Sequence, residues 1–257
     1  MQVHETAIVS PDAKIADDVE IGAYSIIGPK VSIGAGCVIG PHVVITGNTT
    51  IGENNRFFQF SSIGEQPQDK KFAGEDTKLV IGNNNTVREF CTFNVGTNQG
   101  GGVTRIGNDN WIMAYVHIAH DCMIGNDVIM ANNATLGGHV TVGDFAILSG
   151  FSGVHQFVEI GQHCFVSFAS HVNKSIPPYV TVSGEKAKAK GVNTEGLKRR
   201  GFSAQQVKNV RRAYRTLYRS SLSLEDAIDK LAAMDEESGE ISSMVDFLNN
   251  VERSIIR

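Results

Sequence analysis

Large apolar residues, mostly branched aliphatic ones, recur at every sixth position along most of the first two thirds of the chain. The longest unbroken series has twelve members: Ile106, Ile112, Ile118, Ile124, Met130, Leu136, Val142, Leu148, Val154, Ile160, Val166 and Val172. An amphipathic helix would repeat every 3.6 residues and a half-buried strand every second residue. A period of six is instead typical of a solenoid in which each short face takes one hexad.

Three such faces close a triangular coil of three hexads, or 18 residues. Stacked coils then lie about 4.7–4.9 Å apart, the ordinary spacing of neighbouring strands. Gly, Asn or Asp often follows the aliphatic residue, and we expect these residues to turn the corners because positive φ costs them little. The pattern predicts an all-β solenoid, a parallel β-helix, over residues 1–185.

Two stretches interrupt the period. Residues 64–80 and 94–105 lack aliphatic residues at the expected positions, and the second contains Gly100, Gly101 and Gly102. We interpret both as loops ejected from the solenoid, and long loops on a rigid scaffold often carry binding residues.

The last part of the chain, residues 186–257, has a helical pattern. Ser203 and Gln206 form a capping-box signature, and the apolar residues behind them have helical spacing. A second helix is predicted to begin at Ser223 and a third to span residues 241–254. We expect this helical domain to cover the last coil, whose strand edges would otherwise be unpaired.

The composition narrows the class of protein. The N-terminal residues do not resemble a signal peptide, and no apolar stretch is long enough to span a membrane. The four cysteines have no metal-ligand spacing, so we expect reduced, packed thiols in a cytoplasmic protein.

Charge is distributed unevenly along the chain. The net charge is −4, but residues 186–219 carry 11 basic residues and 1 acidic residue. This basic block predicts an acidic partner. A nucleotide phosphate or an acidic carrier protein fits better than nucleic acid, because no nucleic-acid-binding motif accompanies the block. A merely solvated helix face is the other interpretation.

Histidines cluster in the unbroken series of hexads. Four of the eight fall between residues 117 and 155, namely His117, His120, His139 and His155. Residues 18 apart should share a column, one strand spacing apart. The predicted columns are His120 with Gly138 and Gln156; Asp121 with His139; and Ala114 with Asn132, Gly150 and Phe168.

These columns suggest acyl transfer. They place His120 beside Gly138, a residue whose bare N–H can face a substrate oxygen. A base for proton removal next to an oxyanion donor is the minimal equipment for that reaction. Two other interpretations remain open: a zinc site formed by His117, His120 and His139, as in a gamma-class carbonic anhydrase-like hydratase, and a purely structural solenoid.

Several runs of residues closely resemble the UDP-N-acetylglucosamine O-acyltransferase family of lipid A biosynthesis, whose hexapeptide repeats wind into a left-handed β-helix. The matching runs are Ile63-Gly64-Glu65, Gln68-Asp69-x-Lys71, His117-Ile118-Ala119-His120-Asp121, Ala131-Asn132-Asn133, Gly138-His139-Val140, Val154-His155-Gln156-Phe157, Pro177-Pro178-Tyr179-Val180 and the segment from Gly191 to Phe202. The resemblance extends over essentially the whole chain, including the helical part.

The resemblance implies transfer of an (R)-3-hydroxyacyl chain from acyl carrier protein to the 3-position of UDP-N-acetylglucosamine, by a homotrimer with its active sites between subunits. It implies neither metal nor cofactor. His120 would be the general base and the Gly138 N–H the oxyanion donor. The implied sugar and diphosphate ligands are Asp69, Lys71, His117, Asp121, His139 and Gln156, and the implied nucleotide ligands are Asn193, Glu195, Arg199 and Arg200.

The chain also departs from the family. Relatives commonly carry His-Arg where this chain has Asn94-Val95, which suggests that the enzyme prefers or accepts the 3-amino analogue of the sugar. Phe168 occupies a position where some relatives have Gly, at the far end of an acyl groove that also includes Asn132 and Gly150. A ring there predicts a shorter acyl chain. Nothing in the sequence explains Glu185.

Overall fold

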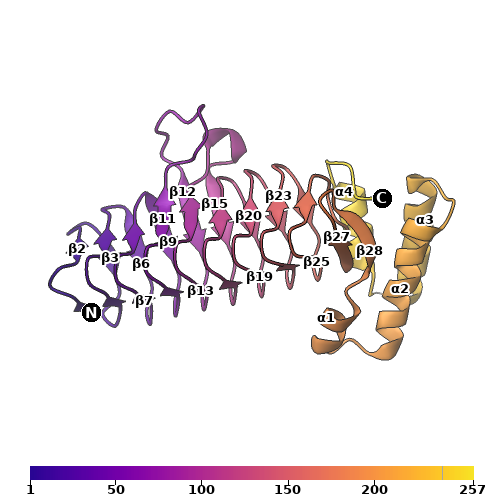
Figure 1. Ribbon diagram of the computed structural model, residues 1–257, viewed down its shortest axis with the longest axis horizontal. Coiled ribbons are helices and arrows are strands. Elements are labelled where there is room, and N and C mark those ends of the chain that lie inside the picture. The colour runs from indigo at the N-terminus through magenta and orange to yellow at the C-terminus, as the bar shows by residue number, and fades with distance from the viewer. Residues whose placement is uncertain (239) are drawn as a thin grey trace.

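The protein, described here from a computed structural model that covers residues 1–238 and 240–257, is a long solenoid that ends in a helical domain (Figure 1). The side chains of residues 236–238 lie outside this description. Three parallel sheets run along the solenoid. This arrangement confirms the parallel β-helix that the six-residue period predicted.

The strands are short, and each coil contributes one strand to each sheet. Sheet 1 contains β1 (Gln2–Val3), β4 (Glu20–Ile21), β7 (Val38–Ile39), β10 (Arg56–Phe57), β13 (Thr86–Val87), β16 (Trp111–Ile112), β19 (Ile129–Met130), β22 (Ile147–Leu148), β25 (Phe165–Val166), β27 (Val180–Ser183) and β28 (Lys188–Val192). Sheet 2 contains β2 (Ile8–Val9), β5 (Ile26–Ile27), β8 (Val44–Ile45), β11 (Ser62–Glu65), β14 (Thr92–Asn94), β17 (His117–Ile118), β20 (Thr135–Leu136), β23 (Gly153–Val154) and β26 (His171–Val172).

Sheet 3 completes the triangle. It contains β3 (Lys14–Ile15), β6 (Val31–Ile33), β9 (Asn48–Ile51), β12 (Lys78–Ile81), β15 (Val103–Ile106), β18 (Met123–Ile124), β21 (Thr141–Val142) and β24 (Glu159–Ile160). The chain passes from sheet 1 to sheet 2, then to sheet 3, and back to sheet 1. We call the turns between them corner 1–2, corner 2–3 and corner 3–1.

The register follows the 18-residue coil. Ile118 pairs with Leu136, and Leu136 with Val154. All three side chains point inward and are buried. The aliphatic columns form one continuous core along the solenoid. Complete burial of one such side chain contributes about 1.5–3 kcal/mol to the stability of the fold.

Two coils contain extra residues, and both eject them at corner 2–3, on the same side of the solenoid (Figure 1). The first loop is shorter than the predicted range 64–80. β11 extends to Glu65, and β12 begins at Lys78 and buries Leu79 in the core. The second loop contains a short 3-10 helix, η1 (Asn98–Gly100), and β15 resumes at Val103.

The corners fit only in part the expectation that Gly, Asn or Asp would supply positive φ. The positive-φ position recurs every sixth residue, and Asp121, Asp127 and Asn133 occupy it as expected. Residues of other types occupy the later positions: His139, Phe145, Phe151, Phe157, His163 and Ala169. The glycines directly after the aliphatic residues have another role. A Cβ on Gly34 would lie 2.7 Å from the Gly52 carbonyl carbon, so these glycines permit close approach of successive coils.

The C-terminal domain covers the last coil. β27 and β28 form an antiparallel hairpin that extends sheet 1. The helices in the described part of this domain are α1 (Thr194–Arg199), α2 (Ala204–Arg219), α3 (Leu224–Ser238) and α4 (Ser242–Asn250). They enclose a second apolar core around Leu197, Leu217 and Leu231. None of the described helices has the length and apolar character needed to cross a membrane.

The capping box of α2 is confirmed: the Ser203 hydroxyl accepts from the Gln206 N–H, and the Gln206 side chain accepts from the Ser203 N–H. The third predicted helix, 241–254, is too long. α4 ends at Asn250 because the following residues return to the solenoid, where the Ser175 and Ile256 N–H groups donate to Ser254 O and Ser175 O, respectively.

Candidate active site

The predicted base lies at corner 2–3, directly after β17. His120 Nδ1 lies 2.7 Å from Asp121 Oδ2, and the Asp121 side chain is almost fully buried. Because a carboxylate can only accept, Nδ1 carries the hydrogen and Nε2 keeps its lone pair. Among the described residues, none hydrogen-bonds to His120 Nε2, so this nitrogen is available to take a proton.

Asp121 is held in place from the second ejected loop. The Thr97 N–H donates to Oδ1 over 2.8 Å, and the Thr97 hydroxyl donates to Oδ2 over 2.7 Å. The Asp121 N–H donates to the Thr104 hydroxyl over 2.7 Å. These bonds satisfy the buried carboxylate and fix its orientation toward the imidazole.

Gly138 lies against the His120 imidazole, as predicted from the 18-residue spacing that places both residues in one column. A Cβ built on Gly138 would lie 2.5 Å from His120 Cε1 and 2.7 Å from Nε2. Any side chain here would therefore displace the ring. No acceptor among the described residues bonds to the Gly138 N–H. A substrate oxygen placed beside His120 can therefore accept that hydrogen bond.

Two more histidines border the pair. His139 Nε2 lies 3.8 Å from Asp121 Oδ2, and the ring stacks on Phe157 with centroids 4.3 Å apart. His117 shares a 2.7 Å hydrogen bond with the Thr92 hydroxyl. Burial lowers the pKa of both histidines, so both are mainly neutral near pH 7 and can hydrogen-bond to sugar hydroxyls.

The zinc-ligand set considered from the sequence is not the one that the structure assembles. In the described part of the chain, the group of side chains able to share a metal ion is His120, Asp121 and His139. Asp121 takes the place expected for His117, whose Nδ1 is bonded to Thr92. The column rule pointed to Asp121 and His139 but not to the bond between Asp121 and its neighbour His120.

The remaining sugar-pocket candidates lie around this corner. Asp69 is half-buried in the first ejected loop, and its Oδ1 accepts from the Lys71 N–H over 3.0 Å. The charge of Asp69 acts to raise the pKa of His139. Gln156 is exposed, and its carbonyl accepts from Arg253 Nη1 over 2.9 Å. The C-terminal segment thus contacts the coil that carries Gln156.

The four nucleotide candidates lie elsewhere, at corner 3–1. They line a cavity of about 360 Å³ between α1 and sheet 1. The other residues that line it are Ile129, Phe145, Ile147, His163, Phe165 and Gly196. Within one chain, therefore, the structure separates these candidates from the His120 site.

Each end of α1 is fixed. Asn193 caps the helix by accepting from the Gly196 N–H over 3.1 Å, and its Nδ2 donates to the His163 carbonyl over 3.0 Å. Arg200 reaches back to Asp127 over 3.2 Å and lies over the Phe145 ring. These contacts hold α1 against the solenoid.

Glu195 and His163 set the electrostatics of this cavity. Glu195 forms an exposed 2.9 Å ion pair with Lys198, which lowers the pKa of that carboxyl. Burial, aided by the positive charge of Arg200, lowers the pKa of His163 to about 4. His163 is therefore neutral, and it stacks between Phe145 and Tyr179.

Sequence reasoning missed several residues of both sites. The 18-residue rule could have found His163 above Phe145, and Phe157 above His139. It could not have found Thr97, because that residue comes from a loop outside the coil count.

The proposed acyl-groove residues share a column at corner 1–2. A Cβ on Gly150 would lie 3.2 Å from Asn132 O and 3.2 Å from Phe168 Cε2. Phe168 is 67% exposed, and its ring meets that of Phe151 edge to face, with centroids 5.5 Å apart. The Phe168 ring therefore lies over the backbone of Gly150. Phe168 is at corner 1–2 and His120 is at corner 2–3, so the outward-facing side chains of sheet 2 lie between them.

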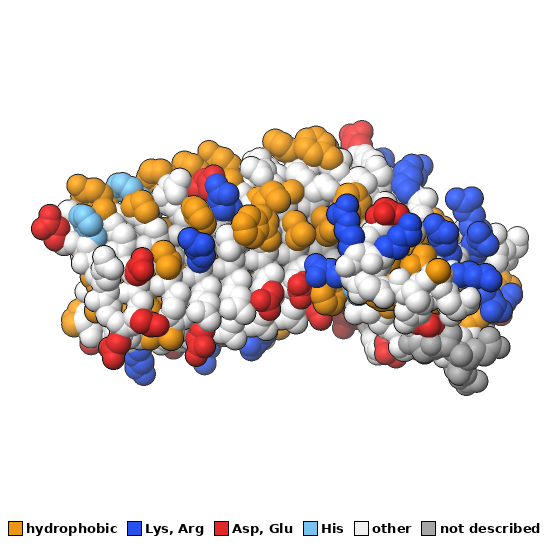
Figure 2. All heavy atoms as spheres, turned by 90° about the horizontal axis from the view of Figure 1, so that it is seen from below, with side chains coloured by type: hydrophobic (Ala, Val, Ile, Leu, Met, Phe, Trp, Pro, Cys, Tyr) orange, Lys and Arg blue, Asp and Glu red, His pale blue; other side chains and the backbone are white. Residues whose placement is uncertain are grey.

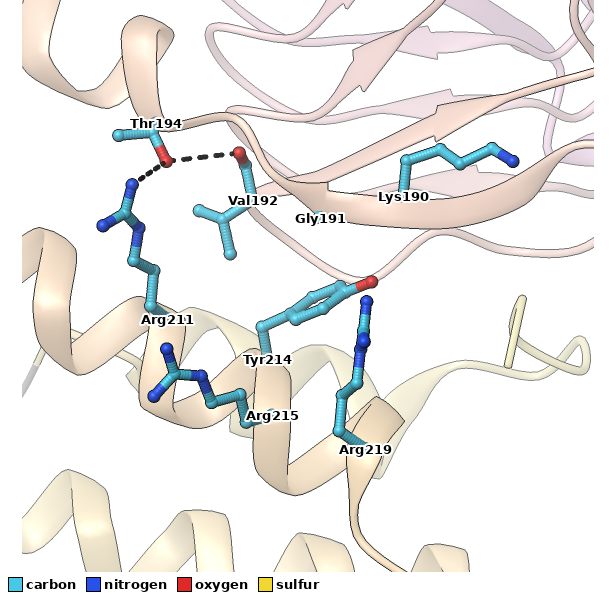
Figure 3. A pocket seen from close by; sticks show the side chains of 8 residues that line it. All are labelled: Lys190, Gly191, Val192, Thr194, Arg211, Tyr214, Arg215 and Arg219. Carbon is cyan, nitrogen blue, oxygen red and sulfur yellow. Dashed lines mark hydrogen bonds between the residues drawn. The ribbon is translucent and has the colours of Figure 1, made fainter.

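The basic block forms hollows on the C-terminal domain, where Figure 2 shows Lys and Arg side chains gathered at one end of the molecule. One hollow of about 650 Å³ lies between β28 and α2 (Figure 3) and is lined by Lys190, Gly191, Val192, Thr194, Arg211, Tyr214, Arg215 and Arg219. Arg211 Nη2 donates to the Thr194 hydroxyl over 3.3 Å. This hollow is strongly positive and suits an acidic partner.

Comparisons with known proteins agree with one another. Residues 176–256 match the family model described as Udp N-acetylglucosamine O-acyltransferase, domain 2, and residues 104–138 match the bacterial transferase hexapeptide model. The chain is 57% identical to the acyl-[acyl-carrier-protein]–UDP-N-acetylglucosamine O-acyltransferase of Thiobacillus denitrificans and 53% identical to that of Herminiimonas arsenicoxydans, with 99% of every chain covered.

Solved structures give the same result. The UDP-N-acetylglucosamine O-acyltransferase of Moraxella catarrhalis superposes with a TM-score of 0.98 at 46% identity over 100% of both chains. The Arabidopsis UDP-N-acetylglucosamine acyltransferase superposes with a TM-score of 0.86 at 35% identity, over 99% of this chain and 100% of that one.

Proposed function

Because this chain belongs to the family of UDP-N-acetylglucosamine O-acyltransferases, we propose that it transfers an (R)-3-hydroxyacyl chain from acyl carrier protein to the 3-hydroxyl of UDP-N-acetylglucosamine, the first step of lipid A biosynthesis. The observation that carries this proposal is the His120 imidazole, oriented by Asp121 and lying against the bare Gly138 backbone.

The chemistry follows from these three residues. His120 Nε2 takes the proton from the sugar 3-hydroxyl as its oxygen attacks the thioester carbonyl. Negative charge develops on the carbonyl oxygen and is stabilised by the Gly138 N–H. The carbon–sulfur bond then breaks, and the carrier's sulfur leaves with the proton that His120 had accepted. The products are an ester of the sugar nucleotide and the free thiol of the carrier.

Asp121 acts through His120. Its carboxylate fixes the tautomer with hydrogen on Nδ1 and stabilises the imidazolium that forms during the transfer. The Thr97 contacts keep the carboxylate from turning away. His117, His139, Gln156, Asp69 and Lys71 would surround the sugar and the diphosphate.

We also propose that three copies assemble around the solenoids, so that the nucleotide candidates of one copy complete the His120 site of the next. An exposed aromatic ladder along corner 1–2 supports this assembly: Tyr24, His42, Phe60, Phe90 and Tyr115 stack in succession with centroids 4.7–5.1 Å apart. Exposed apolar side chains on the flanking sheets, including Ile26 and Trp111, extend this surface. A contiguous apolar surface of this kind marks an interface.

We propose that the basic hollow between β28 and α2 receives acyl carrier protein (Figure 3). An acidic partner would be steered to this face by its charge, so this contribution should weaken with salt. The free cysteines and the carrier and nucleotide substrates suit a cytoplasmic enzyme.

A second acceptor, the 3-amino analogue of the sugar nucleotide, is favoured by residues at the base of the second loop. Asn94 and Val95 are buried, where relatives place His and Arg. Asn94 Nδ2 donates to the Glu65 and Gln66 carbonyls, and its Oδ1 has no hydrogen-bond partner among the residues that the structure describes. Neither residue presents a cation near the sugar pocket.

The test is mass spectrometry of products after the pure protein is incubated with UDP-N-acetylglucosamine and a mixed pool of 3-hydroxyacyl carrier proteins. An acylated sugar nucleotide would support the proposal and report the chain length. Full activity of a folded His120→Ala variant would refute the role of His120, because loss of a general base should reduce the rate by about 10²–10⁴. A parallel reaction with the 3-amino analogue decides the preferred acceptor.

A further inference from the structure

The His120 site also has the donor set of a transition-metal site. His120, Asp121 and His139 each offer one ligand atom, and the three atoms lie within 4.8 Å of one another. Imidazole nitrogen and carboxylate oxygen are preferred ligands of Zn²⁺. From this geometry we infer that the site binds a Zn²⁺ ion, and that the bound ion reversibly inhibits acyl transfer. The inhibitory part of the inference rests on the proposed function.

His139 and Asp121 are spaced for one shared ion, and because all three donor atoms lie within 4.8 Å of one another, a small movement of His120 completes the site. Zn²⁺ lies about 2.0–2.1 Å from histidine nitrogen and about 2.0–2.2 Å from carboxylate oxygen. One ion can therefore join two donors up to about 4 Å apart. His139 Nε2 and Asp121 Oδ2 are 3.8 Å apart, too far for a hydrogen bond and within this span.

The ligands are already held in position. The Asp121 side chain is fixed by two hydrogen bonds from Thr97. The His139 ring is fixed by stacking on Phe157, and its backbone N–H donates to the His120 carbonyl. Partners of this kind orient metal ligands and raise affinity. The two imidazoles remain partly exposed, so an ion can enter from solvent.

Inhibition follows from what the ion displaces. The hydrogen on His120 Nδ1 now lies in a 2.7 Å bond to Asp121 Oδ2. An ion shared by Asp121 and His120 takes the carboxylate lone pair that orients the base. If the ion binds Nδ1, the hydrogen of that nitrogen moves to Nε2, and if the ion binds Nε2, it occupies the lone pair of the base directly. His120 can then no longer accept the sugar proton. Mg²⁺ prefers an all-oxygen shell and should neither bind here nor inhibit.

Binding is measured first and without activity. Untagged, metal-free protein is dialysed to equilibrium against Zn²⁺, with Co²⁺ absorption as a second readout of nitrogen and oxygen ligation. We expect one Zn²⁺ per chain. His139→Gln should weaken Zn²⁺ binding by tenfold or more, and Thr97→Val by about 10-fold to 100-fold. His171→Gln, an exposed histidine on β26, is the matched control and should bind as the unaltered protein does.

Activity is measured next. Zn²⁺ should inhibit transfer over the concentration range in which it binds, and a chelator should restore the rate. No Zn²⁺ binding by the unaltered protein, or equal binding by His139→Gln, would overturn the metal site. Binding without inhibition would overturn the inhibitory role. Zn²⁺ binding by a metal-free protein that transfers no acyl chain would instead refute the proposed function while supporting the site.

Discussion

His120 and Asp121 are consecutive residues whose side chains bond to each other, with Nδ1 2.7 Å from Oδ2. Consecutive side chains in a strand point to opposite faces, but here the chain turns a corner and Asp121 has a φ of 60°. The turn brings the base and its carboxylate to the same side of the backbone. The dyad therefore depends on the corner geometry of the solenoid.

Replacing Asp121 with Asn should keep the shape of the site and lose its charge. The Asn side chain can present N–H to His120 and favour the wrong tautomer, so we expect kcat to fall by about 10²–10⁴ with little change in the KM for UDP-N-acetylglucosamine. Steady-state kinetics and a pH–rate profile check this prediction. Thr97→Val should have a smaller effect of the same kind. A purely structural Asp121 would lower the unfolding temperature and leave kcat of the folded fraction intact.

The stability of the protein should fall in mild acid because of His163. Its pKa is about 4 in the folded chain, against about 6.5 in an unfolded one. Below pH 6.5 the unfolded chain takes up a proton that the folded chain does not, so stability is lost as pH falls from about 6.5 toward 4. In a chain of this size, a loss of about 1 kcal/mol lowers the unfolding midpoint by about 2–4 °C.

His163→Phe is the matched variant, because it keeps the ring stack with Phe145 and Tyr179 and removes the titrating group. Thermal unfolding is measured at several pH values between about 4.5 and about 7.5. The unfolding midpoint of this variant should depend less steeply on pH than that of the unaltered protein. An identical slope in both proteins would contradict the assignment to His163. The lowered pKa values of His117 and His139 should leave a residual slope.

Phe168 should limit acyl-chain length. Its ring lies over Gly150 in the column of the proposed acyl groove, so Phe168→Gly should open space and shift the preference toward longer chains. One methylene in an apolar pocket changes kcat/KM by about 10-fold or more. Competition between acyl carrier proteins of different chain length, read by mass spectrometry, measures this shift. An unchanged preference would mean that the chain runs elsewhere, for example past Phe151.

Charge on the basic hollow should control recognition of the carrier. Arg215→Glu should raise the KM for acyl carrier protein by about five- to tenfold at low salt, and the difference should shrink at high salt. The KM for UDP-N-acetylglucosamine should not change. Lys14→Glu, on β3 at the far end of the solenoid, is the control. An equal effect of both variants would point to net charge and away from a docking site.

Most of the solenoid could be predicted because its physics is local and repeated. The spacing from Ile106 to Val172 fixes both the strands and the columns, so the contact between His120 and Gly138 could be inferred by counting. Counting residues could not predict contacts made by the loops that the solenoid ejects. The bonds from Thr97 to Asp121 depend on how a loop folds back, which no period encodes.

The helical domain was less predictable for a similar reason. The pattern behind Ser203 identified α2 because an amphipathic face and a cap coincide there. α1 has only six residues and one buried side chain, Leu197, so it carries almost no periodic signal. The end of α4 is set by pairing between the tail and Ser175, a contact distant in sequence.

The unbroken part of the solenoid can change in length only by whole coils. Between Ile106 and Val172, inserting a single residue into a strand would shift the register of every later aliphatic side chain, and an insertion between His120 and Gly138 would also separate that pair. Inserting one whole coil would keep the core and lengthen the molecule by a layer, at the cost of moving Phe168 away from His120 if the coil fell between them. Corner 2–3 tolerates extra residues of irregular length, because two coils already eject loops there while β9, β12 and β15 stay in register. The loops beside the candidate active site can therefore change in length without disturbing the stacking of the other coils.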